Sequence, residues 1–98
     1  MAKAYMVVTY RSIRNPEALA AYAKLAGPAI EAEGGKFLVR GSPVKTYELG
    51  MPQRTIVAVF ASVARARAAY EGPAYLKALE ALGKGNVERD MRIVEGLD

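Results

Sequence analysis

The chain has 98 residues, no cysteine and no histidine, and its 14 lysines and arginines exceed its 10 acidic residues, so the net charge is +4. This length predicts a single domain over residues 1–98. Disulfides, thiolate nucleophiles, Ser-His-Asp catalysis and metals bound by Cys or His are excluded. We therefore expect no metal and no cofactor. Any catalysis must use Tyr, Lys, Arg, Asp, Glu, Ser or Thr side chains, or the substrate itself.

The basic residues are scattered along the chain, and none of their groupings is typical of an arm that binds nucleic acid. The charge therefore indicates solubility, or at most a preference for small anions. The N-terminal apolar stretch, Ala4–Val8, is too short for a signal peptide or a membrane span. From these features we expect a cytoplasmic protein with no membrane partner.

The first half of the chain predicts a strand followed by a helix. Ala4–Tyr10 is rich in β-branched and aromatic residues, as strands are. Asn15 is a good N-cap and Pro16 suits the first helical position. Gly34-Gly35 should end this helix, and Pro28 should kink it. Its apolar stripe consists of Leu19, Tyr22, Ala23, Ala26 and Ile30.

The rest of the chain predicts further strands at Lys36–Arg40, Thr55–Ala61 and Met91–Glu95. After a Gly-Ser-Pro turn, Val44–Glu48 is interpreted as a short edge segment. Ser62 can cap a helix that Glu71-Gly72-Pro73 interrupts and Gly83 ends. The order β-α-β-β-α-β predicts an α+β, ferredoxin-like fold with both helices on one face of the sheet.

Two of the predicted strands are apolar on both faces, which bears on the oligomeric state. A strand that is open to water on one face should alternate between apolar and polar residues. Thr55–Phe60 and Ala4–Val8 do not alternate in this way. A chain of this length has no third layer to cover the second face. We therefore expect a homodimer that packs sheet against sheet, the arrangement of a dimeric α/β barrel.

Arg40 ends an otherwise apolar strand, and strand alternation predicts where it points. Phe37 and Val39 suit the face covered by helices, so Arg40 should point to the open face, into the dimer. A cation at that place needs a carboxylate, a carbonyl or an anionic ligand. Glu48, beyond the turn, is the nearest acidic candidate that follows Arg40 in the sequence.

Four residues are candidates for a ligand site on this face of the sheet: Arg40, Glu48, Tyr5 and Arg54. Two other interpretations of Arg40 stay open, a solvated side chain and a structural ion pair with Glu48. The helical tyrosines Tyr22, Tyr70 and Tyr75 are interpreted as core residues, each with a polar tip.

Residues along nearly the whole chain resemble domain-of-unknown-function family 1330, a member of the dimeric α/β-barrel superfamily. The resemblance is carried by Ala4-Tyr5, Tyr22, Gly34-Gly35, "FLVRG" from Phe37 to Gly41, Glu48, Arg54 before "TIVAVF", Ala69-Tyr70, Pro73-Ala74-Tyr75 and "IVEG" from Ile93 to Gly96. It implies a ferredoxin-like monomer that pairs through its sheets, and no established activity.

The sequence leaves three functions open. In the first, the homodimer binds a small anionic or carbonyl-containing molecule, and it could be a cofactor-independent enzyme, as some other dimeric α/β barrels are. Arg40 would then bind a ligand oxygen, Tyr5 would orient the ligand, and Glu48 would fix Arg40 or act as a general base.

The second function is an interaction dimer with no active site. The third is a nucleic-acid-binding module, because RRM domains share the β-α-β-β-α-β order. This third possibility is disfavoured, since the two central strands offer only Phe60 and Tyr5 as stacking aromatics. We expect no nucleic-acid partner.

Overall fold

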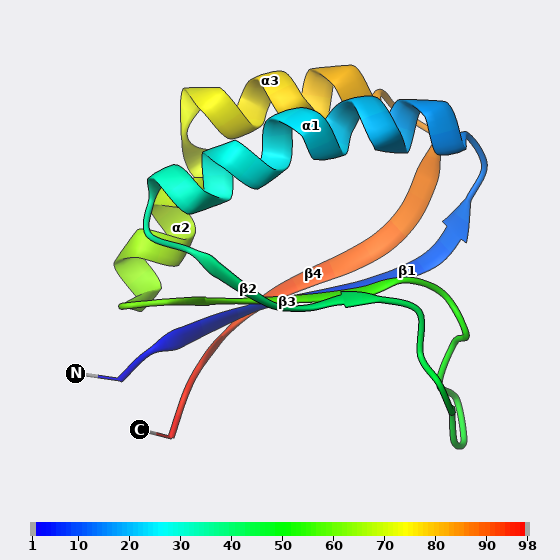
Figure 1. Cartoon of the computed structure of the whole chain (residues 1–98), viewed down its shortest axis with the longest axis horizontal. Coiled ribbons are helices and arrows are strands. Elements are labelled where there is room, and N and C mark those ends of the chain that lie inside the picture. The colour runs from blue at the N-terminus through cyan, green and yellow to red at the C-terminus, as the bar shows by residue number, and fades with distance from the viewer. Residues whose placement is uncertain (1, 98) are drawn as a thin grey trace.

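The computed structural model describes residues 2–97 and has two layers, a four-stranded sheet with three helices on one face (Figure 1). The elements follow in the order β1 (Ala4–Ile13), α1 (Pro16–Ala32), β2 (Lys36–Gly41), β3 (Thr55–Phe60), α2 (Val63–Glu71), α3 (Pro73–Leu82) and β4 (Val87–Glu95). All neighbouring strands are antiparallel, in the order β2-β3-β1-β4. The predicted ferredoxin-like fold is confirmed, with the second helix split into α2 and α3.

Local sequence explains where the helices begin and end. The Asn15 side chain accepts a hydrogen bond from the Ala18 amide at 3.1 Å, and this satisfies a donor at the start of α1. Ser62 does the same for α2. The predicted break at Gly72 is present, and Gly83, with a φ of 73°, ends α3. The helix α1 continues through Pro28 without ending there.

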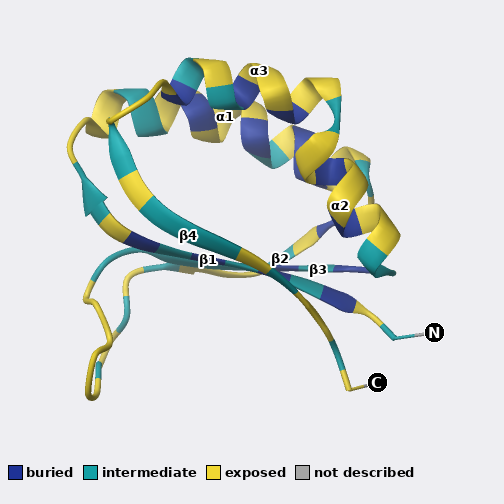
Figure 2. Ribbon diagram, turned by 180° about the vertical axis from the view of Figure 1, so that it is seen from behind, coloured by how far each residue is buried: buried dark blue, intermediate teal, exposed yellow. Residues whose placement is uncertain are grey.

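The hydrophobic core lies between the helices and one face of the sheet (Figure 2). Along β1, alternate residues are buried, so Met6 and its like-facing neighbours point towards the helices. In the register of the sheet, Met6 lies between Ala58 of β3 and Ile93 of β4. Tyr22 and Tyr75, predicted as core residues, are buried as expected, whereas Tyr70 is partly exposed.

Three element boundaries differ from those predicted. The last strand begins at Val87 rather than Met91, and β1 continues to Ile13. Both extensions pair with each other, because Ile13 lies opposite Val87. Val44–Glu48 is not a strand: it belongs to the loop between β2 and β3, where Glu48 has a positive φ of 54°. No helix within residues 2–97 is both long enough and apolar enough to cross a membrane.

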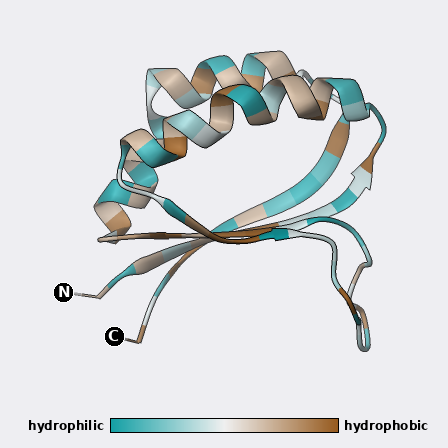
Figure 3. Cartoon of the chain, viewed as in Figure 1, coloured by the Kyte–Doolittle hydropathy of each residue, from teal (hydrophilic) through white to brown (hydrophobic). Residues whose placement is uncertain are grey.

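The face of the sheet away from the helices, here called the open face, carries apolar side chains with no cover in the monomer. The central strand β3 is hydrophobic along much of its length (Figure 3). Tyr5 and Val7 of β1 lie there beside Val57 and Val59 of β3, and all four are only half-buried. The loop of residues 42–54 projects beyond this side of the sheet in both side views (Figures 1 and 2).

Gly35 fits a close contact between α1, β2 and β3, which gives a test of the packing. A Cβ atom at Gly35 would lie 2.5 Å from Ile30 Cγ2 and 2.7 Å from Phe60 Cε2. We expect Gly35→Ala to lower the free energy of unfolding by about 1–3 kcal/mol, as overpacking does. Urea unfolding measures the change. The matched Gly41→Ala, where a Cβ would meet nothing within 4 Å, should change stability far less. Equal losses in both variants would contradict this packing.

Candidate functional site

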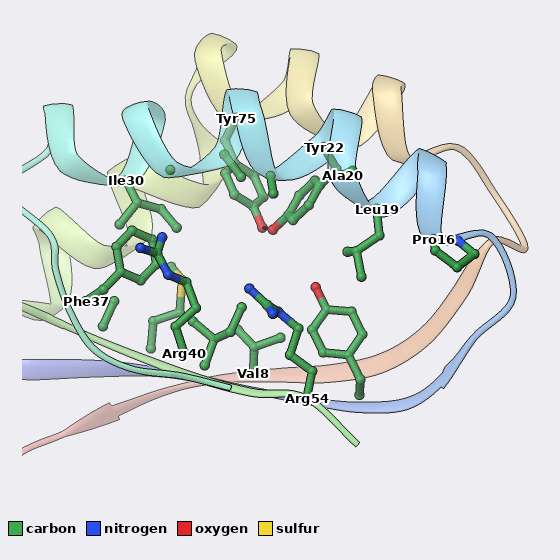
Figure 4. A pocket seen from close by; sticks show the side chains of 17 residues that line it. Val8, Pro16, Leu19, Ala20, Tyr22, Ile30, Phe37, Arg40, Arg54 and Tyr75 are labelled. Atoms are coloured by element: carbon green, nitrogen blue, oxygen red, sulfur yellow. Dashed lines mark hydrogen bonds between the residues drawn. The ribbon is translucent and has the colours of Figure 1, made fainter. Parts of the chain in front are cut away.

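A pocket of about 320 Å³ lies between α1 and the helix-facing side of the sheet (Figure 4). Its walls are mostly apolar, and Leu19, Ile30, Phe37 and Ile56 are among the residues that line them. A volume of this size with apolar walls is typical of small-molecule sites. The pocket is therefore the first place to look for a function, and it lies on the opposite side of the sheet from the predicted dimer cavity.

Two guanidinium groups enter this pocket from the sheet. Arg40 at the end of β2 and Arg54 just before β3 both line it, and in Figure 4 both point from the sheet towards the helices. The Arg40 guanidinium carbon lies 4.6 Å from the centre of the Phe37 ring, a cation–π contact. Within residues 2–97, no ion pair joins either arginine to a carboxylate. Both guanidiniums are therefore free to bind an anion.

The predicted orientation of Arg40 was wrong, because β2 contains an irregularity. The register with β3 shifts between Phe37, opposite Ala58, and Val39, opposite Val57. Leu38 is the extra residue, so alternation restarts after it, and Val39 lies on the open face. Arg40 then lies opposite Ile56, on the helix side. A one-residue shift in a strand moves every later side chain to the other face.

Three tyrosine hydroxyls meet at a third arginine, Arg89 of β4. Arg89 Nη1 donates to the Tyr10 hydroxyl at 3.1 Å and to the Tyr22 hydroxyl at 3.0 Å, and Nη2 lies 3.5 Å from the Tyr75 hydroxyl. The Tyr22 and Tyr75 hydroxyls also hydrogen-bond to each other. Tyr10, Tyr22 and Tyr75 line the pocket, and Figure 4 shows the Tyr22 and Tyr75 hydroxyls pointing down towards the sheet. We call these four residues the tyrosine–arginine cluster.

Burial and nearby charges shift the pKa values of three members of this cluster, Tyr10, Tyr75 and Arg89. Burial raises the pKa of Tyr75 and of Tyr10, and the nearby Arg89 charge only partly opposes it. Burial by itself would lower the pKa of Arg89, but its interactions with the tyrosine oxygens outweigh this and raise it. At neutral pH Arg89 is thus a cation, and Tyr10 and Tyr75 beside it are neutral phenols.

The other two predicted site residues lie away from the pocket. Tyr5 pairs with Val59 and Val94 on the open face, so it cannot reach a ligand between α1 and the sheet. Glu48 lies exposed in the loop between β2 and β3, and within residues 2–97 no ion pair joins it to Arg40. The structure thus brings Arg40 and Arg54 together, but neither Tyr5 nor Glu48 with them.

Sequence reasoning missed the tyrosine–arginine cluster, although it left a signal. Tyr10 shares the alternation of Met6 and Val8, so its place on the helix-facing side follows from β1 alone. Arg89 was missed because the last strand was predicted to begin at Met91. Extending the alternation of Met91 backwards by two residues places Arg89 on the same face.

The fold and the pocket define a class of protein: a ferredoxin-like α+β domain with a pocket between the helices and the sheet. Within this class, the chain belongs to the DUF1330 family, a domain of unknown function, whose family model matches residues 3–97. The resemblance drawn from the sequence is thereby confirmed. A comparison with curated proteins gives no match.

Solved structures of other proteins show the same fold. A protein of unknown function from Rhodopseudomonas palustris has a TM-score of 0.76 at 21% identity, over 99% of this chain and 84% of that chain. SnoaB, a cofactor-independent oxygenase from Streptomyces nogalater, has a TM-score of 0.59 at 14% identity, over 99% and 93%. A dimeric ferredoxin-like protein of unknown function from Thermobifida fusca has a TM-score of 0.54 at 13% identity, over 96% and 91%. These likenesses establish the shared fold.

The raised pKa of the buried tyrosines predicts a loss of stability in alkali. Tyrosines of the unfolded chain ionise near pH ~10, whereas buried Tyr75 keeps its proton to higher pH. The folded state then binds more protons, so its advantage is complete below pH ~10 and is lost as the pH rises further. The slope is up to about 1.4 kcal/mol per pH unit for each such tyrosine. The free energy of unfolding, measured by urea titration at several pH values between about pH 9 and pH 11, should fall less steeply with pH in Tyr75→Phe than in the wild type. Identical slopes would contradict the prediction.

Proposed function

We propose that the pocket binds a small organic anion with an apolar body. The observation that carries the proposal is the pair of guanidiniums, Arg40 and Arg54, which enter an otherwise apolar pocket without acidic partners in the described chain. Arg40 is exposed and Arg54 is half-buried, so both guanidiniums are accessible to a ligand that enters the pocket. An anionic group would gain charge-assisted hydrogen bonds from them. Guanidinium groups suit carboxylates and other oxyanions because they donate two parallel hydrogen bonds.

A matched pair of aromatic probes tests this proposal. Isothermal titration calorimetry with 4-nitrobenzoate and its neutral amide, 4-nitrobenzamide, separates the charge from the ring. We expect tighter binding of the carboxylate, and a loss of about tenfold in its affinity in Arg40→Ala or Arg54→Ala, which corresponds to about 1.4 kcal/mol. Binding of the amide should change little in these variants.

The control for that experiment is Lys77→Ala, which removes one positive charge from an exposed position of α3 outside the pocket. If Lys77→Ala lowered the affinity for 4-nitrobenzoate as much as Arg40→Ala did, the effect would come from net charge rather than from the pocket. Absence of carboxylate binding by the wild type would overturn the proposed function.

A second candidate function is cofactor-independent catalysis in the same pocket. The fold shared with SnoaB, a cofactor-independent oxygenase, supports it. The lining contains no histidine, cysteine, aspartate or glutamate, so no side chain in it has an ordinary pKa below neutral. Glu48, the general base considered from the sequence, lies outside the pocket. A reaction here would therefore use the tyrosine and arginine side chains of the lining, or the substrate itself.

The open face supports a homodimer as the working form of the chain. Its half-buried valines and Tyr5 form an apolar surface that a second copy can cover, sheet against sheet. The loop of residues 42–54 projects on the same side and exposes Val44 (103%) and Leu49 (96%). The Thermobifida fusca neighbour is a dimeric ferredoxin-like protein, which supports the same assembly.

The open face also argues against the nucleic-acid-binding alternative. RRM domains display stacking aromatics on the exposed faces of their two central strands. Phe60 of β3 is 1% exposed and packs in the core on the helix side. Among residues 2–97, this leaves Tyr5 as the one aromatic side chain on the open face of β1 and β3.

A charge placed on the open face tests the dimer. We expect Val57→Lys to give a monomer at micromolar concentration, because two lysines would meet without partners near a twofold interface. Size-exclusion chromatography with light scattering measures the mass. Leu76→Lys, on the exposed surface of α3, is the matched control and should remain dimeric. A monomeric wild type, or a dimer of Val57→Lys, would contradict sheet-to-sheet pairing.

A further inference from the structure

The tyrosine–arginine cluster has more hydrogen-bond donors than acceptors. Each of the three hydroxyls has one proton, and each accepts from Arg89 or lies close to it. The Tyr22–Tyr75 hydrogen bond uses one proton of that pair. Within the described chain, no acceptor is paired with the Tyr10 proton or with the second proton of the pair. Two phenol protons at the pocket wall therefore remain available to a ligand oxygen.

The charges around the pocket also favour a negatively charged ligand, because they are all positive. Arg40 and Arg54 line the pocket, and Arg89 donates to the hydroxyls of Tyr10 and Tyr22, which also line it, so three cations lie in or next to this space. No acidic residue lines the pocket, and within residues 2–97 Arg89 has no carboxylate partner. Arg89 also lies 4.7 Å from the centre of the Tyr22 ring. The cation behind each phenol makes its hydroxyl a stronger donor.

These donors and positive charges would favour the ionised form of a weakly acidic hydroxyl group on a ligand. In its neutral form it brings a further proton, which would have to compete with Arg89 for the phenol oxygens. In its ionised form, one oxygen can accept both available phenol protons and lie near the guanidiniums. Opposite charges nearby and hydrogen bonds to the charged form both lower the pKa of an acid.

We infer that the pocket selectively binds the ionised form of a phenol or enol, lowering the pKa of that hydroxyl group, with Tyr10, Tyr22 and Tyr75 as hydrogen-bond donors and Arg89 as their positioning residue. The inference rests on the proposed function, since it names the class of anion that the same pocket takes. The ligand hydroxyl releases its proton to solvent on binding. The product is an electron-rich phenolate or enolate enclosed by apolar walls.

The test uses 4-nitrophenol, whose phenolate absorbs visible light and whose neutral form does not. Its apparent pKa is measured by absorbance in a pH titration, free and with saturating protein. We expect the wild type to lower that pKa by about one unit or more. Tyr22→Phe and Tyr75→Phe should each reduce the shift, because each removes a donor while keeping the ring. Arg89→Gln should also reduce it.

Tyr70→Phe is the matched control. Its ring packs against Tyr75 with centroids 4.9 Å apart, but Tyr70 does not line the pocket. Tyr70→Phe should therefore leave the pKa shift of 4-nitrophenol unchanged. Binding of 4-nitrobenzoate, which is already ionised, reports in every variant whether the pocket is still folded and competent.

The outcomes separate the inference from the proposed function. If 4-nitrobenzoate binds but the pKa of 4-nitrophenol is unchanged or raised, the inference is overturned and the anion site stands. If the shift is the same in Tyr22→Phe, Tyr75→Phe and Arg89→Gln as in the wild type, Arg40 and Arg54 cause it alone and the assigned role of the cluster is overturned. If neither probe binds, both proposals fail. A shift that these variants reduce and Tyr70→Phe retains supports the inference.

Discussion

The interior of this protein depends on the hydrogen bonds between the half-buried guanidinium of Arg89 and three tyrosine hydroxyls. The partners of Arg89 come from three other elements, Tyr10 of β1, Tyr22 of α1 and Tyr75 of α3, so one side chain of β4 links the sheet to both long helices. A cation in such a place must be hydrogen-bonded, because leaving it unpaired costs several kcal/mol. Here neutral phenols perform that role, and the charge remains uncompensated by any acid in the described chain.

This choice of partners explains why the pocket is polar at one wall and apolar elsewhere. The helices must cover the sheet with apolar side chains, and Ile30 and Leu19 of α1 do so. Tyr22 and Tyr75 also bury their rings, but their hydroxyls must reach Arg89, and this directs them towards the sheet. A fully aliphatic core would leave the Arg89 guanidinium without partners. The same constraint thus stabilises the fold and sets hydrogen-bond donors beside the pocket.

Most of the fold could be predicted from sequence because its signals are local. Asn15, Pro16 and Ser62 act within one helical turn, and the alternation of β1 is continuous from Ala4 to Tyr10. The candidate site was less accessible, since it depends on contacts between elements that are distant in sequence. Tyr22 and Tyr75 were recognised as core residues with polar tips. That both tips meet Arg89, 67 and 14 residues further along the chain, is a property of the packing alone.

Arg40 shows most clearly what strand alternation cannot reveal. Strict alternation from Phe37 placed it on the open face, and the extra residue, Leu38, reverses that placement. In the proposed dimer, strict alternation would bury a cation between two sheets, where Glu48, the partner considered from the sequence, belongs to an exposed loop. The bulge instead gives Val39 to the open face and Arg40 to the pocket. The two faces of this sheet therefore have separate roles: the centre of the open face, at β1 and β3, stays apolar for a second copy, and Arg40 lies on the side where an anion can enter.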